Sequence, residues 1–178
     1  PATDSWLASV QENVATLPGP LAGLTERLQV FRFRPGMPRA LAPLFQRISG
    51  RRVALEIEDP WCGVRPQTRL RLARFVEAVS AAGVDIERLT VVWNPGHGEP
   101  DTPQSQSNAL LNELRSAGVQ IKPEFSFRSG QDRHFHDRVV TARTLDEGVE
   151  IKLRWDVTAG IDNLMSRSKE CSVFIEER

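Results

Sequence analysis

The sequence predicts an α/β domain with a mixed, largely parallel sheet flanked by helices, and three observations support this fold class. The chain has 178 residues, of which 40% are hydrophobic, which suits one domain with its own core. From residue 53 onward, short apolar runs typical of strands alternate with amphipathic segments of helical periodicity. Two of those helical segments are followed by glycine, at Gly83 and Gly118, as is common at helix C-termini. Strands joined through helices run parallel, because the crossover helix returns the chain to the end of the sheet at which the previous strand began.

Residues 1–50 are expected to form a helical N-terminal extension to this domain. Apolar residues recur at helical spacing within 7–14, and a proline- and glycine-containing break follows at 18–20. A second amphipathic helix is expected over 41–48, where apolar residues follow the i, i+3, i+4, i+7 pattern. The α/β domain then occupies residues 51–178.

The α/β domain is expected to begin with alternating strands and helices and to end with a hairpin. The first elements are a strand at 53–58, a helix around 72–79, a strand at 89–93, a helix around 110–117 and a strand at 119–127. The last are strands at 135–142 and 149–155 joined by a hairpin-like connection, a helix at about 161–168 and a strand at 171–175. Apolar and charged residues alternate strictly over 149–155, so one face of the sheet is predicted to meet solvent.

The charge balance limits the classes of partner. Lys plus Arg and Asp plus Glu both number 23, and the resulting zero net charge argues against unspecific attraction to nucleic acid or to anionic membranes. One or two specific phosphate contacts remain compatible with it. No apolar run is long enough for a transmembrane segment. The protein is therefore expected to be cytoplasmic.

The cysteines and the first residue give three further expectations. Cys62 and Cys171 lie in or beside apolar runs, which favours buried free thiols in a reducing compartment over a disulfide or a metal site. No cofactor and no metal is expected. The sequence starts at Pro1 and not at methionine, so we expect a domain cut from a longer protein.

The first candidate site is the segment from His134 to Arg138. In a strand, residues two apart share a face, so His134, His136 and Arg138 would project together. Phe135 and Asp137 would project from the opposite face. A guanidinium can bind two phosphate oxygens, and an imidazole can donate a hydrogen bond or attack phosphorus. The alternative is an ordinary polar strand edge with two solvated histidines.

The second candidate site is the turn that follows the first strand, from Asp59-Pro60-Trp61 to Arg65. Ligands of open α/β sheets gather at the carboxyl ends of strands, where Asp59 and Arg65 are expected. The alternative is a structural turn, in which Trp61 fills the core and Gln67 or Thr68 caps the next helix.

A third segment, Asn94 to Gly98, is rich in glycine. It lacks the lysine and the spacing of a phosphate-binding Walker loop, so a surface loop is expected. Its His97 has no metal-ligand spacing to the other histidines.

The turn at Asp59, the His136-Asp137-Arg138 run and a later Gly160-Ile161-Asp162 follow one another in an order that resembles a known family. This is the phospholipase D-like C-terminal domain of the MIT-domain-containing protein, with its bacterial relatives, and the likeness covers about residues 52–178. The resemblance implies a phospholipase D-like fold. It also implies a non-catalytic, dimeric domain that binds membrane phosphoinositides in eukaryotic relatives and belongs to multidomain antiviral defence or conflict proteins in bacteria.

The resemblance also assigns roles to residues. Phospholipase D enzymes use a His-x-Lys motif followed by an aspartate, and His136 matches the nucleophile while Arg138 takes the place of the lysine. The position of the downstream aspartate, around Arg143, is basic, and only one such motif is present. Arginine does not readily give up a proton at neutral pH, which implies that hydrolysis is lost and binding retained. The resulting set of ligand-binding residues is Arg65, His134, His136 and Arg138, with structural roles for Asp59, Trp61, Asp137 and Asp162.

The leading prediction is therefore a non-catalytic phospholipase D-like binding module. Its expected partner is a phosphate-bearing ligand, either a lipid headgroup or nucleic acid, or a partner protein, and a homodimer fits the resemblance. One alternative is a dimeric phosphodiesterase or nuclease that pairs two His136 residues. Another is a pure protein-interaction domain in a larger bacterial assembly.

Overall fold

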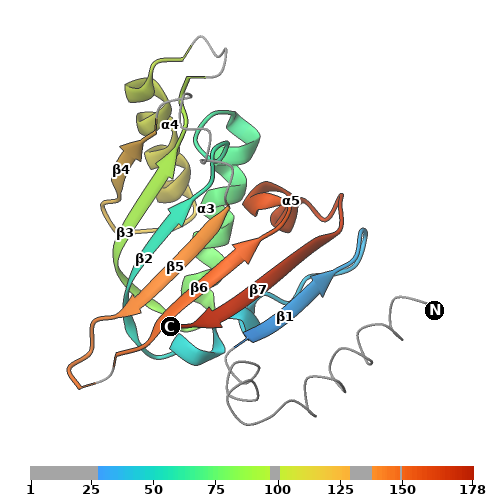
Figure 1. Cartoon of the computed structure of the whole chain (residues 1–178). Coiled ribbons are helices and arrows are strands. Elements are labelled where there is room, and N and C mark those ends of the chain that lie inside the picture. The colour runs from blue at the N-terminus through green and yellow to red at the C-terminus, as the bar shows by residue number, and fades with distance from the viewer. Residues whose placement is uncertain (1–27, 97–100, 129–137, 149) are drawn as a thin grey trace.

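The structure is a computed structural model that describes residues 28–96, 101–128, 138–148 and 150–178. It is an α/β domain built on one seven-stranded sheet with the strand order β1-β7-β6-β5-β2-β3-β4 (Figure 1). The strands are β1 (Leu28–Phe33), β2 (Arg52–Glu58), β3 (Asp85–Trp93), β4 (Glu124–Phe127), β5 (Val139–Thr144), β6 (Lys152–Val157) and β7 (Cys171–Glu177). The helices are the 3-10 helix η1 (Ala42–Ile48) and the α-helices α3 (Pro66–Ala81), α4 (Pro103–Ser116) and α5 (Gly160–Ser166).

The sheet is mixed, as predicted, but its parallel part is smaller than the prediction. Only β2, β3 and β4 pair in parallel, and each of the other four neighbouring pairs in the described sheet is antiparallel. The reason is connectivity. Helices α3 and α4 carry the chain between the parallel strands, whereas β5 and β6 are joined by a short connection that reverses direction. The expectation of a largely parallel sheet was therefore wrong, whereas the hairpin expected near the C-terminus is present as the antiparallel pair β5 and β6.

The structure also departs from the expected helical extension within residues 28–50. Leu28–Phe33 forms strand β1, which pairs antiparallel with β7 along its whole length. Its sequence, LQVFRF, places aromatic residues two apart on the face that packs on the core, a period-two signal that the helical interpretation overlooked. Residues 42–48 form a 3-10 helix that buries Leu44, Phe45 and Ile48. Residues 1–27 lie outside the described residues.

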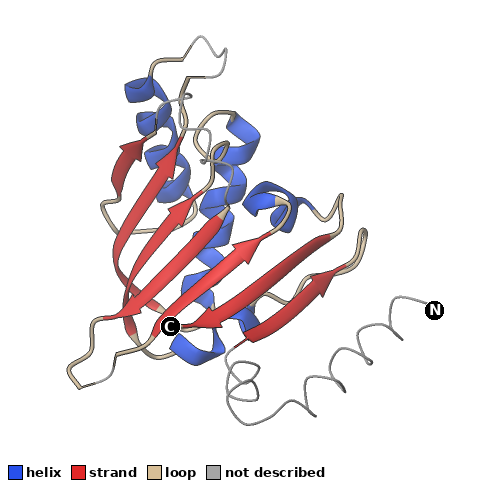
Figure 2. Ribbon diagram, in the orientation of Figure 1, coloured by secondary structure: helices blue, strands red, loops and turns tan. Residues whose placement is uncertain are grey.

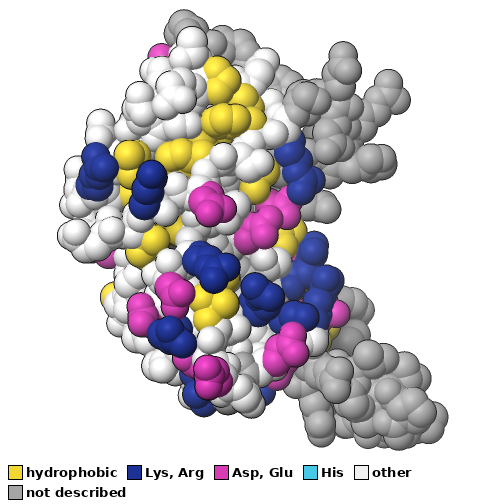
Figure 3. All heavy atoms as spheres, turned by 90° about the vertical axis from the view of Figure 1, so that its left-hand side faces the viewer, with side chains coloured by type: hydrophobic (Ala, Val, Ile, Leu, Met, Phe, Trp, Pro, Cys, Tyr) yellow, Lys and Arg dark blue, Asp and Glu magenta, His cyan; other side chains and the backbone are white. Residues whose placement is uncertain are grey.

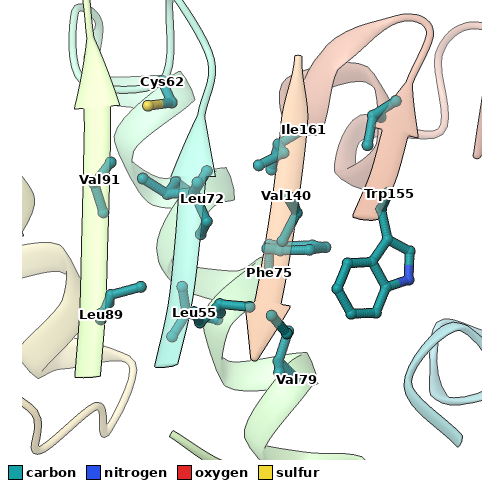
Figure 4. Packing of buried hydrophobic residues seen from close by; sticks show 14 of the residues in the cluster. Leu55, Cys62, Leu72, Phe75, Val79, Leu89, Val91, Val140, Trp155 and Ile161 are labelled. Carbon is teal, nitrogen blue, oxygen red and sulfur yellow. The ribbon is translucent and has the colours of Figure 1, made fainter. Parts of the chain in front are cut away.

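The core lies between one face of the sheet and the helices. In Figures 1 and 2 the helices lie behind the sheet, and α3 contacts η1, α4 and α5. Leu55 of β2 and Val140 of β5 point toward Leu72 and Phe75 of α3, and all four are at most 2% exposed (Figure 4). Burial of such side chains is the main favourable contribution to folding. The alternation predicted for 149–155 is present in β6, where buried Leu153, Trp155 and Val157 alternate with more exposed residues, and Glu56 of β2 is likewise exposed.

The surface mixes both signs of charge. Figure 3, which shows the side of the molecule where β4 lies, has Lys, Arg, Asp and Glu side chains interspersed over its lower half. This arrangement agrees with the balanced composition. Among the described helices, none has the length and apolar character needed to cross a bilayer.

Candidate functional site

A cavity of about 280 Å³ lies at the end of the sheet where β2 and β6 finish and β5 begins. It is lined by Asp59, Trp61, Val64, Arg65, Thr68, Arg138, Ala159, Gly160, Asp162 and Asn163. The carboxyl ends of neighbouring strands are the usual ligand position in open α/β sheets. Here that position coincides with the boundary between the parallel and antiparallel parts of the sheet, because β2 pairs in parallel with β3 and antiparallel with β5.

The first wall of the cavity is the connection between β2 and α3. The Trp61 N–H donates to Oδ1 of Asp59 at 3.0 Å, the arrangement of an Asx turn. The Cys62 and Val64 N–H groups donate to the carbonyls of Asp59 and Trp61 at 3.3 and 3.2 Å. Cys62 and Val64 are buried, whereas the Trp61 side chain remains 40% exposed. Trp61 therefore lies at the cavity and does not fill the core.

Helix α3 begins beside this wall. The Arg65 N–H donates to Oγ1 of Thr68 at 3.1 Å, and the Thr68 hydroxyl donates to the Arg65 carbonyl at 2.9 Å, so Thr68 caps the helix start. The buried Arg69 reaches back from α3 and donates from Nη1 to the carbonyls of Gly63 and Val64 at 3.2 and 2.9 Å. The Arg65 side chain lies at the cavity with its backbone fixed by these contacts.

The opposite side of the cavity depends on a close contact between Arg138 and Gly160. Arg138 directly precedes β5, and its Nη1 donates to the Thr158 carbonyl at 3.3 Å. Gly160 has a φ of 78°, and a Cβ atom there would lie 2.7 Å from Cδ of Arg138 and 2.9 Å from Oδ2 of Asp59. Only glycine fits both the left-handed backbone and this space. The absence of a side chain at Gly160 leaves room for Arg138, which lines the cavity.

Asp59 joins the two sides. Its Oδ2 accepts the Ile161 N–H at 3.1 Å, while its Oδ1 holds Trp61, and the residue is 3% exposed. Burial raises the pKa of the Asp59 carboxyl above its ordinary value, against the opposing effects of the two N–H donors and of the Arg138 charge. The carboxyl group of Asp59 thus fixes the relative position of two chain segments at the base of the cavity.

Two arginines outside the cavity hold α5 in place. Arg71 of α3 forms an ion pair with Asp162, and Arg39 donates from Nη1 to the carbonyls of Asn163 and Leu164, the latter at 2.6 Å. Sequence reasoning missed both arginines. Their partners lie 91 and more residues away along the chain, so no local pattern connects them.

Of the residues predicted from sequence, five line this one cavity: Asp59, Trp61, Arg65, Arg138 and Asp162. His134, His136 and Asp137 lie outside the described residues, so the shared face of His136 and Arg138 stays a prediction. Arg143 is exposed on β5, opposite Ala54 and Lys152, and does not line the cavity.

The structure gives partial information on metals and thiols. Within the described residues, His, Cys, Asp and Glu side chains form no cluster of three that could hold a metal ion. All three histidines of the chain, including His97, fall outside that part, so the expectation of no metal stays untested. Cys62 and Cys171 are buried free thiols, as predicted, and burial raises the pKa of both.

Comparison with known proteins gives weak structural likenesses. No protein-family model matches the chain, and neither does any curated protein. A polyphosphate kinase from Porphyromonas gingivalis superposes with a TM-score of 0.49 at 10% identity, over 93% of this chain and 26% of the kinase. A yeast tyrosyl-DNA phosphodiesterase gives 0.45 at 10% identity, over 83% of this chain and 31% of the phosphodiesterase. The chain spans less than a third of either protein, and similarity at this level assigns it neither a family nor an activity.

Proposed function

We propose that this chain is a non-catalytic, phospholipase D-like binding module that holds a phosphate group in the cavity between the β2–α3 connection and the start of α5. The observation that carries the proposal is that two guanidinium-bearing side chains, Arg65 and Arg138, line the same cavity. Arginine binds phosphate oxygens in a bidentate manner and keeps its charge at any physiological pH.

The two acidic residues at the cavity are engaged in contacts of their own. Asp162 is engaged in an ion pair with Arg71, and Asp59 is 3% exposed with its two oxygens accepting N–H groups of the backbone. Neither aspartate therefore presents both of its oxygens unengaged to a ligand in the cavity.

Two features support a non-catalytic role. The place of the acidic partner in the related enzymes is basic, around Arg143, and this residue lies on the sheet surface away from the cavity lining. The carboxylates that do line the cavity, Asp59 and Asp162, are held by backbone N–H groups and by Arg71. Asp59 thus uses both oxygens to hold the backbone, and Asp162 is paired with Arg71, whereas a carboxylate that supports a histidine nucleophile or base accepts from the imidazole.

The setting of the module is part of the proposal. We place it in the cytoplasm on the composition of the sequence and, on the resemblance alone, as a homodimer within a larger bacterial protein of antiviral defence. Sedimentation of the purified chain tests the dimer, and a monomer at micromolar concentration would contradict it.

The phosphate site is tested by isothermal titration of the chain with inorganic phosphate and with ribose 5-phosphate. We expect Arg65→Gln and Arg138→Gln each to weaken binding about 10- to 100-fold, the loss typical of a charge-assisted hydrogen bond. Arg143→Gln is the matched control, since it removes one exposed arginine from another part of the sheet and leaves the affinity unchanged. Thermal unfolding of each variant verifies the fold. Unchanged affinity in both cavity variants would show that phosphate binds elsewhere.

The catalytic alternative is tested separately. Incubation of the chain with a chromogenic phosphodiester, followed by a search for phosphohistidine, is expected to give no turnover. Hydrolysis that disappears in His136→Ala would overturn the non-catalytic assignment and favour the dimeric phosphodiesterase.

A further inference from the structure

Trp61 differs from the other tryptophans that the structure describes. Trp93 and Trp155 are 0% and 2% exposed, and each donates its indole N–H to a buried acceptor, Gln106 Oε1 at 2.9 Å and the Leu44 carbonyl at 3.0 Å. Trp61 is 40% exposed and lines the cavity. Among the described tryptophans, Trp61 is the one that is exposed and lines this cavity.

The backbone of Trp61 is fixed by hydrogen bonds on both sides, through its N–H and its carbonyl group. Its N–H donates to Oδ1 of Asp59 and its carbonyl accepts the N–H of Val64 at 3.2 Å. Both neighbours in these contacts are buried. An aromatic side chain on a rigid turn loses little conformational entropy when a ligand packs on it, because few torsions remain to be ordered.

The combination of this ring with two guanidinium groups in one cavity narrows the class of ligand. Arg65 and Arg138 suit a phosphate, and the flat face of an indole suits another flat ring, since bases stack on aromatic side chains whatever their sequence. A cavity of about 280 Å³ lies just below the usual range for small-molecule sites, roughly 300–1,000 Å³, so the ligand is a small one, such as a single nucleotide.

We propose that the ligand is a nucleoside monophosphate unit, with its phosphate at Arg65 and Arg138 and its base stacked on Trp61. This inference rests on the proposed phosphate site and specifies what is attached to the phosphate. The unit is either a free nucleotide or the 5′-phosphorylated end of a single strand. Both sources share the same recognition chemistry, and the experiment separates them.

The experiment compares the affinities of AMP, ribose 5-phosphate and a 5′-phosphorylated hexathymidylate, measured by isothermal titration with the full chain. Stacking of one base on an aromatic side chain predicts roughly 5- to 100-fold tighter binding of AMP than of ribose 5-phosphate. In Trp61→Leu this advantage disappears, while the affinity for ribose 5-phosphate is unchanged. Trp61→Phe restores part of it. Tighter binding of the oligonucleotide than of AMP identifies a strand end, and equal or weaker binding identifies the free nucleotide.

A fluorescence measurement locates the base independently. In a Trp6→Phe background, which removes the tryptophan outside the described residues, AMP is expected to quench emission from Trp61, because Trp93 and Trp155 are buried. Ribose 5-phosphate leaves the emission unchanged.

The two proposals fail in different ways. Equal affinity for AMP and ribose 5-phosphate, both lost in Arg65→Gln and Arg138→Gln, would overturn the nucleotide inference and leave the phosphate site intact. If neither compound binds, the phosphate site itself is wrong and the nucleotide inference falls with it.

Discussion

The connection after β2 and the connection after β6 both lead from a strand into a helix at the cavity, but they are held by contacts of different origin. The first is folded largely by contacts among its own residues, such as Trp61 N–H to Asp59 and Val64 N–H to the Trp61 carbonyl. The second receives its contacts from distant parts of the chain, with Ile161 held by Asp59 and the end of α5 by Arg39. One wall is thus a local structure, and the other depends on the tertiary fold.

The largest loss of stability is expected at Asp59, because this residue contacts both connections. Asp59→Ala removes the acceptor of the Trp61 and Ile161 N–H groups, and an unsatisfied buried donor costs about 1–3 kcal/mol. We expect the free energy of unfolding, measured in urea, to fall by about 2–5 kcal/mol. Asp85→Ala, at an exposed strand start, is the control, with an effect within about 0.5 kcal/mol. A loss at Asp59 no larger than that of the control would show that the shared carboxyl does not hold the walls together.

The next effect is expected at Gly160, which belongs to the second connection alone. Gly160→Ala combines a left-handed backbone with a collision against Arg138 and Asp59, whereas Gly118→Ala has the same backbone region, with φ 79° and open space. The Gly118 variant isolates the backbone strain, about 1 kcal/mol in urea unfolding, and we expect Gly160→Ala to lose about 1–3 kcal/mol more. Only the Gly160 variant is expected to weaken phosphate binding, because it displaces Arg138. Equal losses in the two variants would exclude the close contact.

The smallest effect is expected at Arg39, which supports the second connection from outside. Arg39→Ala removes donors to the carbonyls of Asn163, Leu164 and Lys169, and we expect a loss of about 1–3 kcal/mol in the free energy of unfolding. Arg47→Ala is matched to it as an exposed ion pair with Glu177, worth about 0–1 kcal/mol. Hydrogen exchange is expected to accelerate in the last turn of α5, where the carbonyls of Asn163 and Leu164 lose their donor, and to stay unchanged in the connection after β2. Acceleration in both connections would contradict the different support of the two walls.

The same difference explains what could be predicted from the sequence. The turn at Asp59-Pro60-Trp61 and the helix after it follow from local signals, and the position of Arg65 at the carboxyl end of a strand follows from the same signals. The ties of Arg71 to Asp162 and of Arg39 to α5 span about half of the chain or more and leave no local trace. The alternative that placed Trp61 in the core was wrong, because apolar character alone does not distinguish a core tryptophan from one at a cavity.

For the fold, too, elements with a clear local pattern were predicted and elements that depend on distant contacts were not. Period-two and helical patterns locate β2, α3, β3 and α4, since each is amphipathic or buried along its own length. Strands β5 and β6 run antiparallel because a short connection, and no helix, joins them. The sequence had already indicated a hairpin at this position. Strand β1 was missed because six residues at the edge of a sheet carry a weak pattern beside an expected helical stretch.

The two hydrogen bonds to Asp59 have a consequence for local opening of the protein. The amides of Trp61 and Ile161 are a hundred residues apart, yet they donate to the two oxygens of one buried carboxyl group, so detachment of either segment leaves one of these oxygens without its donor. Segments connected in this way open as one cooperative unit. The exchange rates of these two amides should therefore share a single opening free energy, and an occupant of the cavity would slow both by the same factor.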